Sequence, residues 1–393
     1  MIKRIQKMMI GLIIALMIAP CFFNFIHKIA PIKMFTYSVL EGIIFSEKRP
    51  QFTIDSWISG KYQQQFTNWF SQRFGLREIF IRLNNQIYYM LFDRSYMYNQ
   101  SIIVGKKKQL YERVYIDDYT KHVFPLTPVQ LNHLVEQIAE VQNLFKKHGT
   151  AFLVLLTPSK AYTYPEYIPD SFFDNPISQQ RNYDLILPVL DQYKVNYVDG
   201  QRITLEAKKT ETYPLFCQGG IHWNYLGAYY TIAQLITAIE VFTEKTLPHI
   251  QCSNVQVDAN PTGSDVDLAA LLNLAILPFH YVSPHPVFTT IQSRGSYENN
   301  VVFVGGSFTS VIAELLWENK IFNRIDYYYY YKLNHFAYTA NSANKENCPY
   351  DVNNINWNTE FLNKDAIVLE INVVNINGKY ITEFVEDALN RLR

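Results

Sequence analysis

The chain has 393 residues, enough for one large domain or two ordinary ones, and 48% of them are hydrophobic. Lysine plus arginine and aspartate plus glutamate number 35 each, so the formal net charge is zero at pH 7. This balance argues against a protein that holds nucleic acid through a basic excess.

The first feature along the chain is an apolar segment behind a positive cluster. Lys3, Arg4 and Lys7 precede an uncharged, mostly apolar run over residues 8–26, which is about the length of a membrane-spanning helix. The positive-inside rule places the start of the chain in the cytoplasm and the remainder outside. We therefore expect residues 1–28 to be a single-pass anchor in the cytoplasmic (inner) membrane, with the body on the periplasmic side. A cleaved signal peptide is the alternative.

Two further parts are expected after the anchor. Residues 29–95 read as a juxtamembrane helical lead-in, and residues 96–393 as an α/β domain. The clearest helix of that domain begins after Thr127, which can cap it. Pro128 takes the first helical position, where a missing N–H does no harm, and Gly149 closes the helix.

Strand and helix signals alternate along this domain. Residues 151–156 are apolar throughout, as in a strand of a sheet covered on both faces. The alternation predicts an α/β fold with a mainly parallel central sheet flanked by helices. Residues 246–295 hold many prolines and little periodicity, so we expect loops there. Further strands are expected at residues 101–105, 195–198, 301–304, 325–330 and 366–371, and further helices at residues 77–91, 179–193, 226–242, 310–317 and 381–392.

Neither cysteines nor sequence motifs point to a metal or a soluble cofactor. The four cysteines, Cys21, Cys217, Cys252 and Cys348, have no CxxC spacing. They allow one disulfide without choosing its pair. The chain has no P-loop and no G-x-G-x-x-G after a strand, so we expect no cofactor.

The strongest local signal for chemistry is an apolar strand that runs into Gly305, Gly306 and Ser307. In open α/β sheets, reactive residues gather beyond the carboxyl ends of strands. Glycine lets the backbone approach a substrate closely, and the next helix directs its positive end toward the serine. Ser307 is therefore either a nucleophile or a plain helix cap.

Two other clusters supply candidate partners. His222 and Trp223 stand just before the predicted helix at residues 226–242, and histidine is the usual base for a serine hydroxyl; a lone histidine is also often structural. Lys160 and Tyr164 follow the strand at residues 151–156 and would reach the same rim. Lys160 is either an anion contact or a solvated loop lysine. Aromatic residues form 15% of the chain, which suits sugar binding as well as packing.

Together these pieces resemble the SGNH-hydrolase-like proteins that O-acetylate alginate and related exopolysaccharides. The similarity follows the family's order over most of the chain. The matching segments are Glu47-Lys-Arg-Pro, residues 70–77, Ile102-Ile-Val-Gly-Lys, Thr157-Pro-Ser-Lys with Tyr164-Pro-Glu, Ile221-His-Trp-Asn with Gly227-Ala, and Gly305-Gly-Ser-Phe.

The resemblance implies a serine acyl-transfer site. The family's triad joins the serine of Gly-Asp-Ser-Phe to the histidine and aspartate of Asp-x-His, which implies Ser307 as nucleophile and His222 as base. It also implies that a membrane-bound acyltransferase partner delivers the acetyl group across the membrane, and that the serine passes it to a sugar hydroxyl. The residues expected at the polysaccharide are Lys160, Tyr164, Trp223 and Gly305.

Two positions depart from the family pattern. Gly220 stands where the triad aspartate belongs, and Gly306 where an aspartate precedes the serine. Loss of the triad carboxylate can cost about 10⁴-fold in rate. The sequence leaves three functions open: an O-acetyltransferase, a non-catalytic polysaccharide-binding or scaffold component of an acetylation and export complex, and an esterase. Three aspartates elsewhere are candidates to replace the carboxylate: Asp199, Asp265 and Asp267.

Overall fold

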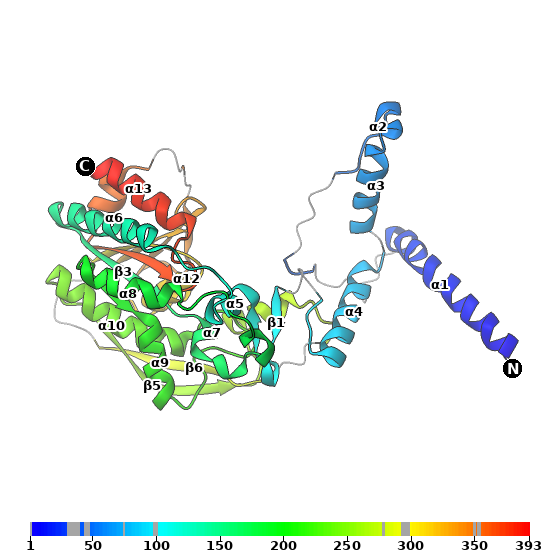
Figure 1. The fold of residues 1–393 in the computed structure, drawn as a ribbon, viewed down its shortest axis with the longest axis horizontal. Coiled ribbons are helices and arrows are strands. Elements are labelled where there is room, and N and C mark those ends of the chain that lie inside the picture. Colours follow the sequence, from blue (N-terminus) through cyan, green and yellow to red (C-terminus); the bar gives the residue numbers. More distant parts are fainter. Residues whose placement is uncertain are drawn as a thin grey trace. The chain divides into compact units, whose positions relative to one another are not determined.

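The chain forms two compact units, drawn in Figure 1. The N-terminal unit comprises Met1–Gln100 with Ala269–Pro278, and the C-terminal unit comprises Ser101–Leu268 with Phe279–Arg393. A computed structural model describes residues 2–29, 40–42, 48–73, 75–96, 101–276, 280–291, 299–348, 351 and 355–393. Glu47 and Phe74 of the family-like lead-in segments lie outside the described residues.

Helices build the N-terminal unit. The helix expected at residues 77–91 is confirmed as α4. Among the helices that the structure describes, none combines the length and the apolarity that a membrane crossing requires. The helices are α1 (Ile2–Ile29), α2 (Ile54–Ile58), α3 (Lys61–Gln72) and α4 (Arg77–Phe92).

A seven-stranded sheet is the centre of the C-terminal unit, in the order β10-β9-β8-β7-β11-β3-β4. Strands β8, β7, β11, β3 and β4 are parallel, as expected, whereas β9 and β10 pair antiparallel at one edge and make the sheet mixed. Its strands are β3 (Ala151–Thr157), β4 (Tyr197–Asp199), β7 (Asn300–Gly305), β8 (Arg324–Tyr329), β9 (Asn334–Thr339), β10 (Glu346–Cys348) and β11 (Ala366–Asn372). A separate hairpin pairs β1 (Ile102–Val104) with β2 (Leu110–Glu112).

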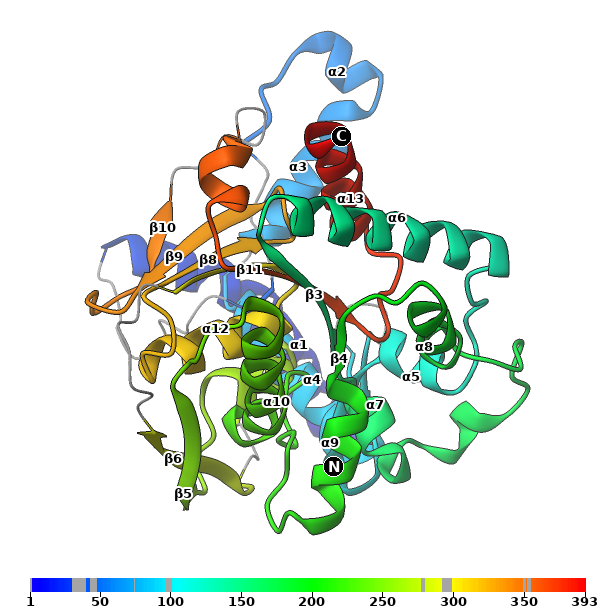
Figure 2. The same ribbon diagram turned by 90° about the vertical axis from the view of Figure 1, so that its left-hand side faces the viewer.

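Helices cover both faces of this sheet, as Figure 2 shows. Helices α6, α8 and α13 pack on one face, and α9, α10 and α12 on the other. Phe152 and Val154 of β3 enter the first core, and Leu153 and Leu155 enter the second, which explains the uninterrupted apolar run. The helices are α5 (Arg113–Tyr119), α6 (Pro128–Lys147), α7 (Lys160–Thr163), α8 (Asn182–Gln192), α9 (Gly200–Thr210), α10 (Tyr225–Thr243), α12 (Phe308–Glu318) and α13 (Lys379–Leu392), with α11 (Asp267–Leu271) where the chain passes between the units.

Local chemistry sets the ends of α6 as the sequence predicts. Thr127 forms a capping box with Gln130: its Oγ1 accepts from the Gln130 N–H at 3.3 Å, and the Gln130 Oε1 accepts from the Thr127 N–H at 3.0 Å. Gly149 follows with a φ of +77°, a conformation that glycine adopts without a steric cost.

The expectation of a loop-rich stretch at residues 246–295 is wrong over the two segments that form strands, and holds for most of the described residues between them. Two long strands, β5 (His249–Asp258) and β6 (Ser283–Ile291), pair antiparallel there. Pro284 and Pro286 were among the prolines that suggested loops. Proline is tolerated in a strand that has a free edge, and both strands of a two-stranded sheet have one. Cys252 on β5 is a free thiol, as are Cys217 and Cys348.

Candidate active site

Ser307 lies at the junction between the central strand β7 and α12. It occupies the N-cap position of α12 with a φ of −63°, yet its side chain makes no capping hydrogen bond. Its Oγ lies instead 2.7 Å from Nε2 of His222, 85 residues earlier in the chain. The serine therefore faces an imidazole at hydrogen-bond distance, where a general base must stand.

The turn before α10 holds His222 in place. The Asn224 side chain caps α10 by accepting from the Gly227 N–H at 2.8 Å. The His222 ring packs edge-on against Phe308, with ring centroids 4.7 Å apart. The second ring nitrogen, Nδ1, is hydrogen-bonded to Oδ2 of Asp267. The imidazole is thus fixed between a hydroxyl and a carboxylate.

Asp267 comes from the segment that the sequence suggested was loop. It is the first residue of α11. Its Oδ1 accepts from the backbone N–H groups of Ile221, at 2.8 Å, and Leu268, at 2.7 Å. Two fixed donors on one oxygen leave the other oxygen for His222. Ser307, His222 and Asp267 consequently form one continuous hydrogen-bonded chain, the arrangement of a catalytic triad.

The same loop explains why glycine stands at the family's aspartate position. A Cβ added at Gly220 would lie 2.3 Å from the carbonyl oxygen of Ser264 and 3.3 Å from Cα of Asp265. The backbone that leads to Asp267 therefore fills the space that an aspartate at position 220 would need. In this chain the carboxylate at His222 comes from a different loop, and the glycine makes room for that loop.

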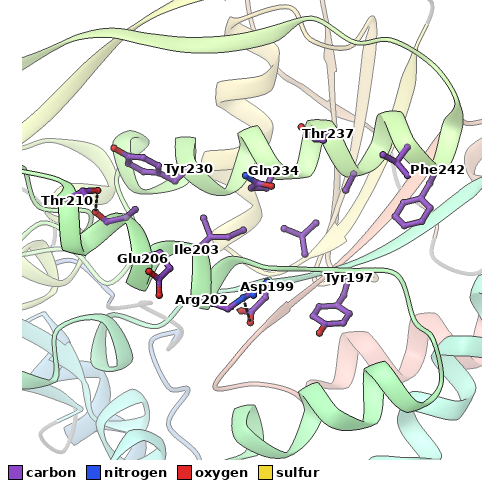
Figure 3. Close-up of a pocket in the computed structure, with 14 residues that line it drawn as sticks. Tyr197, Asp199, Arg202, Ile203, Glu206, Thr210, Tyr230, Gln234, Thr237 and Phe242 are labelled. Carbon is purple, nitrogen blue, oxygen red and sulfur yellow. Dashed lines mark hydrogen bonds and ion pairs between the residues drawn. The ribbon is translucent and has the colours of Figure 1, made fainter.

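The other two candidate aspartates have other hydrogen-bond partners. The Asp265 carboxylate accepts from the Ser283 hydroxyl, and burial raises its pKa. Asp199 caps α9 through the Arg202 N–H at 2.9 Å. It lines a separate cavity of about 980 Å³ between α9 and α10, shown in Figure 3. In the described part of the chain, neither of these carboxylates is bonded to His222.

A buried carboxyl organises the turn before Ser307. Glu370 on β11 is fully buried, and burial raises its pKa. It accepts from the Gly306 N–H at 2.6 Å and from the Thr157 hydroxyl. A Cβ at Gly305 would lie 2.7 Å from Cβ of Glu370, and one at Gly306 would lie 3.5 Å from its Oε2. An aspartate at position 306 would place a second carboxyl beside Glu370, so the two glycines and Glu370 fit together.

The four residues expected to bind the polysaccharide lie beneath the site. Lys160 is fully buried, and burial lowers its pKa to about 7. Its Nζ donates to three carbonyl groups of the segment that leads to His222, at 2.7 to 3.0 Å. The buried Trp223 donates its indole N–H to the carbonyl oxygen of Phe308 at 3.3 Å. Tyr164 accepts from the Leu215 N–H, and Gly305 ends the buried β7. These residues support the site and do not line its cleft.

The open surface of the site is a cleft of about 440 Å³. Both Ser307 and His222 line it, and so does Asp267. Of its remaining lining residues, most come from residues 262–265, β6 and the first turns of α10 and α12: Asn224, Tyr225, Thr262, Gly263, Ser264, Asp265, Pro284, His285, Ser310, Val311 and Glu314. The region with the weakest sequence signal therefore forms one wall.

A match to a family model agrees with the α/β fold of the C-terminal unit. Residues 118–311 match the family model described as an SGNH hydrolase-like domain, acetyltransferase AlgX. The O-acetyltransferase domain of Pseudomonas putida AlgJ is 15% identical, with 74% of this chain and 99% of that one covered and a TM-score of 0.46. Pseudomonas aeruginosa AlgX is 11% identical, with 73% and 67% covered and a TM-score of 0.45. Bacillus cereus PatB1 with a sulfonyl adduct is 11% identical, with 71% and 98% covered and a TM-score of 0.40. A search of curated protein sequences found no match.

Proposed function

Because the chain belongs, through residues 118–311, to the family of SGNH hydrolase-like acetyltransferase domains, we propose that it is an extracytoplasmic O-acetyltransferase of a bacterial exopolysaccharide. The observation that carries the proposal is the hydrogen-bonded chain from Ser307 through His222 to Asp267 beside an open cleft. Three side chains from distant segments meet in the order that acyl transfer needs. A scaffold protein would not need a serine, a histidine and an aspartate hydrogen-bonded in this order.

The geometry supports a two-step transfer. In the first step, Ser307 Oγ attacks the carbonyl carbon of the acetyl donor, and His222 Nε2 takes the hydroxyl proton. The donor's leaving group departs with that proton, and an acetyl ester remains on the serine. In the second step, a sugar hydroxyl gives its proton to His222 and attacks the carbonyl carbon of the ester. The bond between that carbon and Ser307 Oγ breaks, and His222 returns the proton to Ser307 Oγ. Asp267 accepts from Nδ1–H throughout and stabilises the imidazolium, while the positive end of α12 faces the developing oxyanion.

The first residues of the chain support the extracytoplasmic location that we propose. The positive cluster before the apolar run at residues 8–26 supports a single-pass anchor over residues 1–28, with the C-terminal unit on the periplasmic side. An acetyl group has to reach that side from the cytoplasm. We therefore place a membrane-bound acyltransferase partner upstream of Ser307.

The charge of the cleft indicates which kind of polysaccharide can accept the acetyl group. Three carboxylates line it, from Asp265, Asp267 and Glu314, and no lysine or arginine stands among its lining residues in the described part of the chain. Lys345, 3.3 Å from Glu314, offsets one of them. A polyuronate carries a carboxylate on every sugar, which these groups repel. The cleft therefore suits a neutral or amino-sugar acceptor better than a uronate polymer.

Acetyl transfer from a chromogenic acetyl ester tests the proposal. Wild type should form a covalent acetyl-enzyme that mass spectrometry detects, and neutral oligosaccharides should accelerate turnover more than uronate oligomers do. Ser307→Ala should form no acetyl-enzyme, whereas Ser253→Ala, at an exposed serine on β5, should behave as wild type. Equal acetylation of Ser307→Ala and wild type would remove Ser307 from the mechanism. Acceleration by no oligosaccharide would indicate an esterase.

A further inference from the structure

A buried lysine of the C-terminal unit binds the backbone segment that leads to His222. Lys160 is the first residue of α7, just beyond the carboxyl end of β3, and its side chain is fully buried. Its Nζ donates to the carbonyl oxygens of Cys217 at 2.7 Å, Gln218 at 3.0 Å and Gly220 at 2.8 Å. The last of these stands two residues before His222. The general base is therefore attached, through its own backbone, to a charged group beside the central sheet.

These three hydrogen bonds require the lysine to be protonated. An ammonium group has three N–H donors and no acceptor, so each donor can meet one of the three carbonyl oxygens. A neutral amine has two N–H donors, and its lone pair would face the third carbonyl oxygen. The Cys217 and Gln218 carbonyl oxygens also accept backbone N–H groups, at 3.2 and 2.9 Å. The Gly220 carbonyl oxygen has no second donor in the described part of the chain, so it depends on Lys160 alone.

One peptide group connects Lys160 to the acid of the triad. The carbonyl oxygen of Gly220 and the N–H group of Ile221 belong to the same planar peptide unit. The oxygen accepts from Lys160, and the N–H donates to Asp267 Oδ1 at 2.8 Å. A rotation of this unit would move the donor that fixes Asp267 and would also move the residue that follows, His222. The hydrogen-bond geometry of the base therefore depends on the Lys160 bond.

The groups around Lys160 set the pH at which it loses its proton. Burial lowers the pKa of Lys160 to about 7, although Asp267, Cys217 and Asp265 act in the opposite direction. The Tyr111 ring, whose centroid lies 5.3 Å from Nζ, also favours the cation. Burial raises the pKa of Cys217 to about 12 and raises that of Tyr111 as well. Lys160 therefore changes charge close to neutral pH, while its thiol and phenol neighbours stay neutral.

We propose that the Lys160 ammonium is a positioning group for His222, and that acyl transfer slows when this ammonium loses its proton. It orients the peptide unit between Gly220 and Ile221, and that unit orients Asp267 and the imidazole. Lys160 is fully buried and does not line the cleft, so it acts on the reaction through the triad. This inference rests on the function proposed above and adds a dependence on pH to it.

The pH profile of wild-type kcat should have two limbs. The rate rises on the acid side as His222 loses the proton that prevents it from acting as a base. It falls on the alkaline side as Lys160 loses its proton, because only about 1% of a group with a pKa of about 7 stays protonated at about pH 9. Two of the three bonds remain, so kcat should fall by up to about 10-fold between about pH 7 and 9. Turnover of a chromogenic acetyl ester, corrected for hydrolysis without enzyme, measures this change.

Two substitutions assign the alkaline limb. Lys160→Met removes the charge and all three bonds, and should lower kcat at about pH 7 by between about 10-fold and the roughly 100-fold that a misplacement of 1 Å produces. Its KM should stay near the wild-type value, and its kcat should not fall further toward about pH 9. Lys160→Arg keeps a charge at every pH tested, so it should also lack the alkaline limb and should be faster than Lys160→Met. Should neither variant fold, a wild-type kcat that stays constant between about pH 7 and 9 would still overturn the proposal.

Lys208→Met is the matched control, because Lys208 makes similar contacts away from the base. Its Nζ donates to the carbonyl oxygen of Thr163, at the end of α7, at 2.8 Å and lies 4.5 Å from the centroid of the Tyr164 ring. This control should keep the wild-type kcat and pH profile. The double variant of Lys160→Met with His222→Ala completes a cycle in the full-length chain. If Lys160 acts through His222, the double variant should be no slower than His222→Ala alone.

The outcomes separate the two proposals. If His222→Ala keeps wild-type turnover, the triad is wrong and the proposed mechanism fails with it. If His222→Ala is inactive while Lys160→Met equals Lys208→Met in kcat and pH profile, the mechanism stands and the positioning role is overturned. The positioning role is also overturned if the loss from Lys160→Met repeats in full in the His222→Ala background, or if Lys160→Met retains the alkaline limb.

Discussion

The Asp267→Asn substitution is the sharpest probe of the site, because the structure dictates how the new amide must sit. Two backbone N–H groups, of Ile221 and Leu268, point at Oδ1 of the carboxylate, at 2.8 and 2.7 Å. The amide oxygen has to take that place, since an NH2 group there would face two donors. The amide NH2 then faces Nδ1 of His222.

This orientation selects the wrong imidazole tautomer. With Nδ1 accepting from the amide, the proton resides on Nε2, which points at Ser307 Oγ at 2.7 Å. The hydroxyl then has no acceptor for its proton, and the base is disabled without a change of shape. The expected loss in kcat is about 10⁴-fold, or about 5 kcal/mol of transition-state stabilisation.

Turnover of a chromogenic acetyl ester measures this loss, with Asp258→Asn, at an exposed position at the end of β5, as the control. Asp267→Ala leaves space instead of a misdirected amide, so added formate should restore part of its activity and none in Asp267→Asn. A loss of less than about 10-fold in Asp267→Asn would refute the reasoning, because the carboxylate would then not set the tautomer of His222.

Two further predictions follow from the glycine at position 220 and from a buried aspartate. Gly220→Asp should not rescue Asp267→Asn, because its Cβ would meet the Ser264 carbonyl oxygen at 2.3 Å; alone it should cost about 1–3 kcal/mol of stability, measured by urea unfolding. Burial raises the pKa of Asp118, which accepts from the Tyr162 hydroxyl at 2.8 Å, to about 6. The folded form therefore holds a proton between about pH 4 and 6 that the unfolded chain has lost. Wild-type stability should fall as pH rises through that window by up to about 3 kcal/mol relative to Asp118→Asn, measured by urea unfolding at both ends.

Each of these has an outcome that would contradict it. Restored turnover in the Gly220→Asp, Asp267→Asn double variant would mean that the loop at Ser264 yields readily and that the family position remains usable. Parallel stability profiles of wild type and Asp118→Asn between about pH 4 and 6 would mean that Asp118 is ionised in the folded state across that range.

Local sequence signals determined most of the elements of this protein. A Thr–Pro start and a glycine stop define α6, because capping and φ preferences act within a few residues. An unbroken apolar run defines β3, because both faces of the sheet are covered. The strand, glycines and serine at residues 301–307 likewise indicated the position of Ser307, since a strand that enters a helix exposes the residue between them.

Only the tertiary structure decided how the site is completed. His222 and Asp267 are 45 residues apart, and no local pattern links them, because their meeting depends on how the loop at residues 262–267 crosses Gly220. From the sequence, Gly220 left open whether the acid of the triad is lost or comes from another segment, and Lys160 was expected to contact the polysaccharide or to stand in solvent. In the structure, Gly220 leaves room for the loop that leads to Asp267. Lys160 is buried and donates hydrogen bonds to backbone carbonyl groups of the segment that leads to His222. Such contacts follow from the spatial arrangement of distant segments, which composition, periodicity and spacing do not record.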